Sequence, residues 1–217
     1  MTIDNFWKFV QPVQFVILFT FIYGIYSLNF KKINNQFFII LIFLSLSTEI
    51  ITDVLLTKKI DISLFYSIMF IVHNSFWLIF ISYKFLENIS KFLIPVLYFT
   101  FCILNLFFIE GIKVLNYNSF IIGSLIYCAL FFRLSYFNLK NENFYYLKST
   151  EYILLLAPIC FFLGFSFLLA FRNNSLLAYK LFFNFELYNI VTNFSNYIYY
   201  GTLILYVFKE KIIKNET

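Results

Sequence analysis

The sequence predicts an all-α membrane protein, a polytopic bundle of about seven transmembrane helices. Hydrophobic residues make up 62% of the chain, charged residues only 12%, and the mean hydropathy is +0.83. Soluble domains are about half apolar and about a quarter charged. Uninterrupted apolar runs of about 20 residues recur along the whole chain, and a helix of that length crosses a hydrocarbon core of ~30 Å. Composition therefore excludes a water-soluble fold.

Charged residues between the apolar runs mark where one predicted span ends and the next begins. The runs are continuous rather than alternating, which disfavours an outer-membrane β-barrel. We expect residues 1–217 to form a single transmembrane helical domain with spans at 10–30, 36–57, 61–86, 91–110, 115–139, 150–172 and 184–208. Six helices remain the alternative, because polar residues dilute the start of the first span (Gln11, Gln14) and of the last (Asn189, Asn193).

The distribution of the Lys and Arg residues predicts the orientation. If the N-terminus is outside, the cytoplasmic loops hold most of them, including Lys31, Lys32, Lys140 and Lys211. The positive-inside rule then places the N-terminus outside and the C-terminus in the cytoplasm. A net charge of +5 suits basic loops that face anionic headgroups. The expected partner is the lipid bilayer and not nucleic acid, because no nucleic-acid-binding motif is present.

Polar residues inside the spans concentrate on the second, third and seventh. In the second span, Glu49 and Asp53 lie on one helical face together with Ser45, Thr48 and Thr52. An ionisable group at membrane depth costs about 2.5–3.5 kcal/mol and normally faces the bundle interior or a water-filled cavity. Both acids are candidate ligand-binding residues. The alternative for Asp53 is simple hydration near the outer interface.

The single histidine, His73, lies near the middle of the third span, with Trp77 on its face and Asn74 about a quarter-turn away. All three are candidates for a polar site, and a hydrogen-bonded core histidine is the alternative. One histidine cannot build a multi-histidine metal site, so we expect no metal and no cofactor. Because Glu49 and His73 fall near mid-membrane on consecutive spans, we expect a carboxylate–imidazole hydrogen bond between them.

The seventh span carries a polar stripe that steps by three or four residues and falls within an arc of ~80°. An unpaired amide in hydrocarbon costs several kcal/mol, so this stripe must bond to neighbouring helices, to water or to a ligand. Two roles remain open for the stripe. It can form interhelical hydrogen bonds, each worth ~0.6 kcal/mol, or it can form a binding site. The stripe consists of Glu186, Asn189, Asn193, Asn196 and Tyr200.

Two sets of residues resemble known groups of membrane proteins. The stretch from Glu49 through Asp53 to His73 and Trp77, with the tail Asn189-x-x-x-Asn193-x-x-Asn196-Tyr197, resembles a loose group of small uncharacterised seven-helix bacterial membrane proteins. That resemblance extends over most of the chain and implies a fold, not an activity. We expect a multi-pass protein of the bacterial inner (cytoplasmic) membrane.

A second resemblance implies a hydrolase. The segment Asp53-Val54-Leu55-Leu56, followed about twenty residues later by His73, and the segment 162–170 are similar to the lysoplasmalogenase-like YhhN family of polytopic proteins. The later helix of that family carries a second aspartate, where this sequence has Phe165 or Ser166.

These observations favour a non-enzymatic sensor or receptor-like subunit with a polar site between the second, third and seventh helices. The site is expected to open toward the non-cytoplasmic side, because Asp53 and Glu186 lie near that end. We assign no catalytic residue. A structural or assembly subunit of a larger membrane complex is the first alternative, and a small transporter or membrane-embedded hydrolase is the second. The expected partners are other membrane-protein subunits or a separate signalling protein.

Overall fold

A computed structural model describes residues 11–173, 177, 179–180 and 186–216. The described residues form helices and no strand, apart from an isolated antiparallel bridge between Lys180 and Glu186. The all-helical prediction is therefore confirmed for this part of the chain. In order, the helices are α2 (Pro12–Ser27), α3 (Ile33–Thr57), α4 (Ser63–Phe85), α5 (Ser90–Leu104), the π-helix η1 (Asn105–Ile109), α6 (Tyr117–Lys140), α7 (Phe144–Leu147), α8 (Thr150–Leu156), α9 (Pro158–Ala170) and α10 (Leu187–Glu216).

Five helical segments are long and apolar enough to cross a membrane. They are Ile33–Thr57, Ser63–Phe85, Ser90–Ile109, Tyr117–Lys140 and Thr150–Ala170. The chain thus has the character of an integral membrane protein. The expected count of seven stays a prediction. Helix α2 is only 16 residues long, and the polar residues of α10 keep it outside this group.

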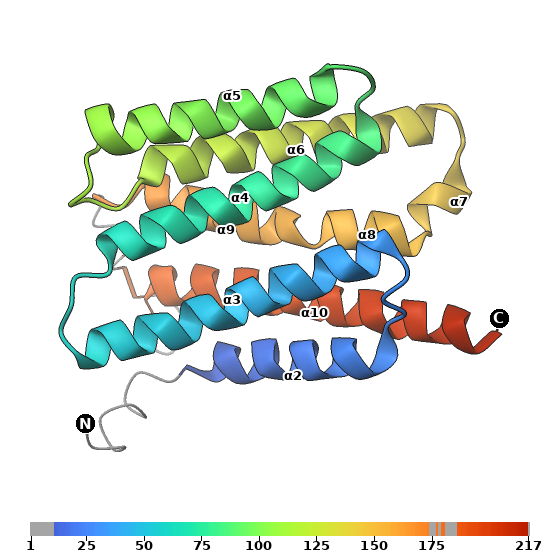
Figure 1. Ribbon diagram of the computed structural model, residues 1–217, viewed down its shortest axis with the longest axis horizontal. Coiled ribbons are helices and arrows are strands. Elements are labelled where there is room, and N and C mark those ends of the chain that lie inside the picture. The colour runs from blue at the N-terminus through green and yellow to red at the C-terminus, as the bar shows by residue number, and fades with distance from the viewer. Residues whose placement is uncertain (1–10, 174–176, 178, 181–185, 217) are drawn as a thin grey trace.

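The long helices lie side by side along one axis (Figure 1). Helix α4 packs against α5 and α6, α9 against α6 and α10, and α2 against α3 and α10. The α3–α4 turn and the η1–α6 loop lie at the end where α2 begins, here called the N-terminal end. The α2–α3 and α4–α5 loops, helix α7 and the end of α10 lie at the opposite end, here called the C-terminal end (Figure 1).

A proline interrupts the predicted span 150–172 and divides it into α8 and α9. Pro158 has no N–H to donate to the carbonyl of Leu154. The backbone N–H of Ala157 donates to that carbonyl oxygen instead, with an N···O distance of 3.3 Å. The hydroxyl of the fully buried Tyr127 donates to the carbonyl oxygen of Leu155 at 2.7 Å. A helix on the facing side of the bundle therefore satisfies a backbone group at the break.

Two ion pairs join the helices at the C-terminal end. Lys32 Nζ lies 2.8 Å from Glu210 Oε2, and the Thr150 hydroxyl donates to Glu210 Oε1 at 2.6 Å. Lys84 Nζ lies 2.6 Å from Glu151 Oε2. Burial alone would raise the pKa of the Glu210 carboxyl, but the hydrogen bonds from Lys32 and Thr150 outweigh it and the pKa is lowered. The contacts of Glu210 fasten α10 to the α2–α3 loop and to the start of α8, and the Lys84–Glu151 pair joins the end of α4 to α8.

Helices α9 and α10 approach each other closely at Gly164. A Cβ atom placed on Gly164 would lie 1.9 Å from Ser195 Oγ and 3.1 Å from Ser195 Cβ. Only glycine leaves room for this approach, as small residues do at many transmembrane helix contacts. The approach fixes α9 and α10 as two adjoining walls of the site described next.

Candidate functional site

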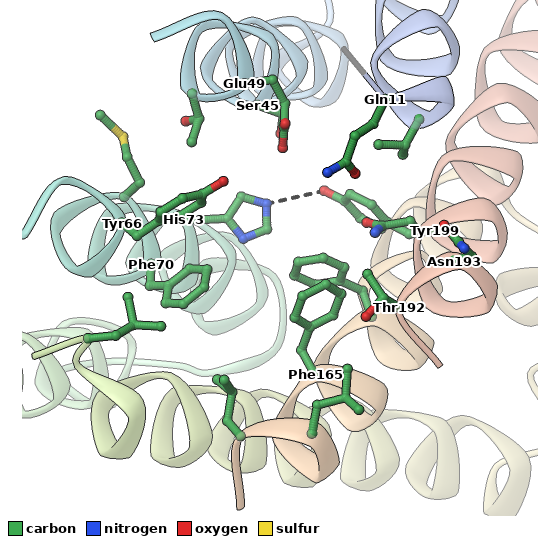
Figure 2. A pocket seen from close by; sticks show the side chains of 18 of the residues that line it. Gln11, Ser45, Glu49, Tyr66, Phe70, His73, Phe165, Thr192, Asn193 and Tyr199 are labelled. Atoms are coloured by element: carbon green, nitrogen blue, oxygen red, sulfur yellow. Dashed lines mark hydrogen bonds between the residues drawn. The ribbon is translucent and has the colours of Figure 1, made fainter. Parts of the chain in front are cut away.

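A cavity of about 710 Å³ lies among α3, α4, α9 and α10, toward the N-terminal end of the bundle. Its volume falls within the range of about 300–1,000 Å³ typical of small-molecule sites. Figure 2 shows side chains from these helices converging on the space. The polar residues that line it are Gln11, Ser45, Thr48, Glu49, Ser63, Tyr66, His73, Tyr117, Tyr188, Asn189, Thr192, Asn193, Asn196, Tyr199 and Tyr200.

Helix α3 contributes the acid of the cavity. Glu49 points toward the space that His73 and Tyr199 border (Figure 2). One turn further along α3, Asp53 is buried and does not line the cavity. The side-chain amide of Gln14 on α2 donates to Asp53 Oδ2 at 3.0 Å and to Glu49 Oε2 at 3.4 Å. The two carboxylates therefore share one neutral donor.

His73 lies in an aromatic setting rather than beside an acid. Its Nε2 is 3.4 Å from the Tyr199 hydroxyl of α10 (Figure 2). Its ring centroid lies 5.7 Å from that of Phe161 and 6.2 Å from that of Tyr199. The prediction of a hydrogen bond between Glu49 and His73 is wrong. Glu49 accepts a hydrogen bond from Gln14, and His73 pairs with the Tyr199 hydroxyl. Both side chains nevertheless line the same cavity.

The stripe on α10 faces the cavity along most of its length. Asn189, Asn193, Asn196 and Tyr200 all line it. Glu186 precedes α10 and forms the bridge with Lys180 instead. The stripe therefore supplies amide and hydroxyl groups to the cavity.

Besides Asp53, two further expected site residues do not line the cavity. Trp77 is fully buried, and its ring centroid lies 5.8 Å from that of Tyr127. Asn74 is also buried, and its side-chain amide donates to the Phe120 carbonyl at 3.1 Å. Both residues belong to the packed core behind the cavity, because their positions on α4 point toward α6.

Aromatic and polar residues that were not among the expected site residues complete the walls. Phe161 and Phe165 of α9 line the cavity, with ring centroids 4.5 Å apart. Thr192 of α10 also lines it, and its buried hydroxyl has no hydrogen-bond partner within the described part of the chain. In the sequence, Gln14 stands out only as a polar residue near the start of the first predicted span. A polar side chain in an apolar run, near the depth of two unpaired acids, was the signal that could have identified it.

The arrangement suits binding rather than metal chemistry. Within the described residues, no group of three or more His, Cys, Asp or Glu side chains could hold a metal ion. The cavity instead combines one lining carboxylate with amides, hydroxyls and aromatic faces. Such a mixture of apolar walls and a few convergent polar groups is typical of sites for small organic ligands.

Comparisons with protein-family models, with curated proteins and with solved structures give no match for this chain. The two resemblances noted from the sequence therefore stay hypotheses. Fold and cavity by themselves define the class: a helical membrane protein of multi-pass character with a polar and aromatic cavity between its helices.

Proposed function

We propose that the protein is a membrane-embedded sensor or receptor-like subunit that binds a small organic ligand in this cavity. The observation that carries the proposal is the course of α10. This helix runs from Leu187 to Glu216, contributes Asn189 through Tyr200 to the cavity, and carries Glu210 into the ion pair at the C-terminal end. One rigid helix therefore connects the cavity with the opposite end of the bundle.

A packed core separates the cavity from the C-terminal end. Trp77, Tyr127 and Phe162 are fully buried, and their rings make edge-to-face contacts below the cavity-lining residues. A ligand that enters the cavity would push on α10 and α3 rather than pass beyond this layer. Such a movement could reach Glu210, Lys32 and the start of α8, where a separate partner could detect it.

The test begins with a variant that fills the cavity from α3. Ser45 lines the cavity, and its hydroxyl donates to the carbonyl of Leu41 on its own helix at 3.1 Å. We expect Ser45→Phe to remain folded. Ligands that raise the melting temperature of the parent protein should no longer bind to this variant. Ile50→Phe is the matched control, because Ile50 is 49% exposed on the outside of the same helix. The measurement is a ligand screen by thermal unfolding in a maltoside detergent.

The sensor role requires a second measurement on the ligand-bound protein. Hydrogen exchange of the peptides around Glu210 and Glu151 should change when a ligand occupies the cavity, and should not change in Ser45→Phe. Binding without any change at that end would contradict the sensor role. A stoichiometric partner that co-purifies with a protein unable to bind any ligand would favour the alternative of a structural subunit.

A further inference from the structure

In the described part of the chain, the cavity wall carries an acidic side chain and no basic one. Among the described residues that line the cavity, Glu49 is acidic and none is Lys or Arg. Asp53 adds a second carboxylate one turn away, joined to the first through Gln14. Since the Gln14 amide is neutral, it satisfies oxygen atoms but does not balance charge. Glu49 is half-buried, and a nearby group of opposite charge favours the ionised form of such a carboxylate.

Aromatic faces surround the space opposite this acid. The ring centroids of Phe161 and Tyr199 lie 5.2 Å apart, and Tyr66 and Phe70 line the wall formed by α4. Rings attract an organic cation through their quadrupoles, most strongly when the cation leaves water. One ring that lines the cavity already binds a cationic side chain. The Arg172 guanidinium lies 4.2 Å from the ring centroid of Tyr117.

We infer that the cavity binds an organic cation, an amine or quaternary ammonium compound, with Glu49 as its counter-ion and the rings of Tyr66, Phe161 and Tyr199 around it. The inference rests on the proposed function and names its ligand class. An inorganic divalent ion is the poorer occupant, because it requires several oxygen ligands in a compact cage. The cavity offers one lining carboxylate and a volume of about 710 Å³.

The experiment compares two probes that share a shape and differ in charge. Choline is the cation, and 3,3-dimethyl-1-butanol is its neutral isostere. Both are titrated onto the full-length protein in a non-ionic maltoside, since a phosphocholine detergent would compete. Tetraethylammonium serves as a larger cation that uses more of the cavity. Binding is followed by the rise in melting temperature and by calorimetry.

Three variants locate the interaction. Glu49→Gln should weaken the binding of choline by about thirtyfold or more, because removing one partner of a desolvated charge pair typically has an effect of this size. Phe161→Leu should weaken it by about two- to tenfold through loss of the ring. Glu87→Gln is the matched control, since Glu87 is an exposed carboxylate in the α4–α5 loop and should leave binding unchanged.

The outcomes separate this inference from the proposed function. Binding of both cations, with little binding of the neutral isostere and sensitivity to Glu49→Gln, supports the organic cation. Equal binding of the alcohol and choline, unaffected by Glu49→Gln, overturns the ligand class but leaves the cavity a binding site. The ligand class is also overturned if only uncharged or anionic ligands bind and Ser45→Phe abolishes their binding. The cavity then still remains a binding site. Failure of every ligand overturns both proposals.

Discussion

The close approach of α9 and α10 makes a quantitative prediction for Gly164→Ala. The new Cβ would lie 1.9 Å from Ser195 Oγ, so the Ser195 side chain must rotate or the helices must separate. Rotation does not remove the second contact, 3.1 Å from Ser195 Cβ, because that atom is fixed by the backbone. Overpacking of this kind typically costs about 1–3 kcal/mol. We expect Gly164→Ala to lower the free energy of unfolding by about 2 kcal/mol.

A second substitution tests the cause of that loss. Ser195→Ala removes the shorter contact and leaves the longer one, so the double variant Gly164→Ala/Ser195→Ala should recover about half of the lost stability. The matched control is Gly201→Ala on α10, where a Cβ would meet nothing within 4 Å. There the gain in helix propensity should raise stability by about 0.5–1 kcal/mol.

The assay is reversible unfolding in mixed maltoside and dodecyl sulfate micelles, followed by circular dichroism. The coupling energy between positions 164 and 195 should be about 1 kcal/mol or larger. If Gly164→Ala were as stable as Gly201→Ala, or if the two substitutions added independently, the α9–α10 contact described above would be refuted.

Three further predictions concern the ends and the centre of the bundle. Because the folded-state pKa of Glu210 is lowered from 4.5, its stabilising contribution is present above that pH and is lost as the pH falls through the folded value. The melting temperature of the parent protein should therefore fall more steeply below pH 4.5 than that of Glu210→Gln; equal slopes would contradict the pairing with Lys32. Tyr127→Phe removes the hydroxyl that donates at the α8–α9 break, and should lower the free energy of unfolding by about 1 kcal/mol in the same micelle assay; an unchanged value would show that the bond contributes nothing. In a variant without the native cysteines, a cysteine at Lys113 should react with an impermeant maleimide from outside and one at Lys211 only after lysis; the reverse pattern would invert the predicted orientation.

Much of the fold could be predicted from composition and periodicity alone. Apolar runs must bond their backbone groups internally in lipid, so runs of about 20 residues are helical whatever their neighbours are. The break at Pro158 also had a local signal, because a proline inside a helix removes one backbone donor. The α8–α9 division was nevertheless missed, since hydropathy does not change across it.

The partners of the polar residues could not be predicted in the same way. The Glu49–His73 bond assumed that consecutive spans meet along the faces that carry their polar groups. Helix α3 packs more extensively against α2 than against α4, so Glu49 meets Gln14 and leaves His73 to Tyr199. Periodicity identifies the polar face of a helix but not the helix that lies opposite that face.

The glycines show the same limit. The sequence contains isolated glycines and no regular small-residue motif, yet Gly164 receives Ser195 at a close helix contact. A motif describes contacts that repeat along two helices, whereas a single crossing point needs only one small residue. Such a residue can be recognised only when its opposite neighbour is known.

The length of α2 has a consequence for the surrounding lipid. Its 16 residues span about 24 Å at 1.5 Å per residue, which is shorter than a hydrocarbon core of ~30 Å. If α2 crosses the bilayer as the sequence predicts, the lipid beside it must become thinner or the flanking residues must reach toward the headgroups, at a modest free-energy cost for each ångström of mismatch. Helix α2 holds Gln14, the shared donor of Glu49 and Asp53, and packs on α10. In that case bilayer thickness acts on the helix whose Gln14 bonds to Glu49 and Asp53, and membranes with shorter acyl chains should favour the arrangement described.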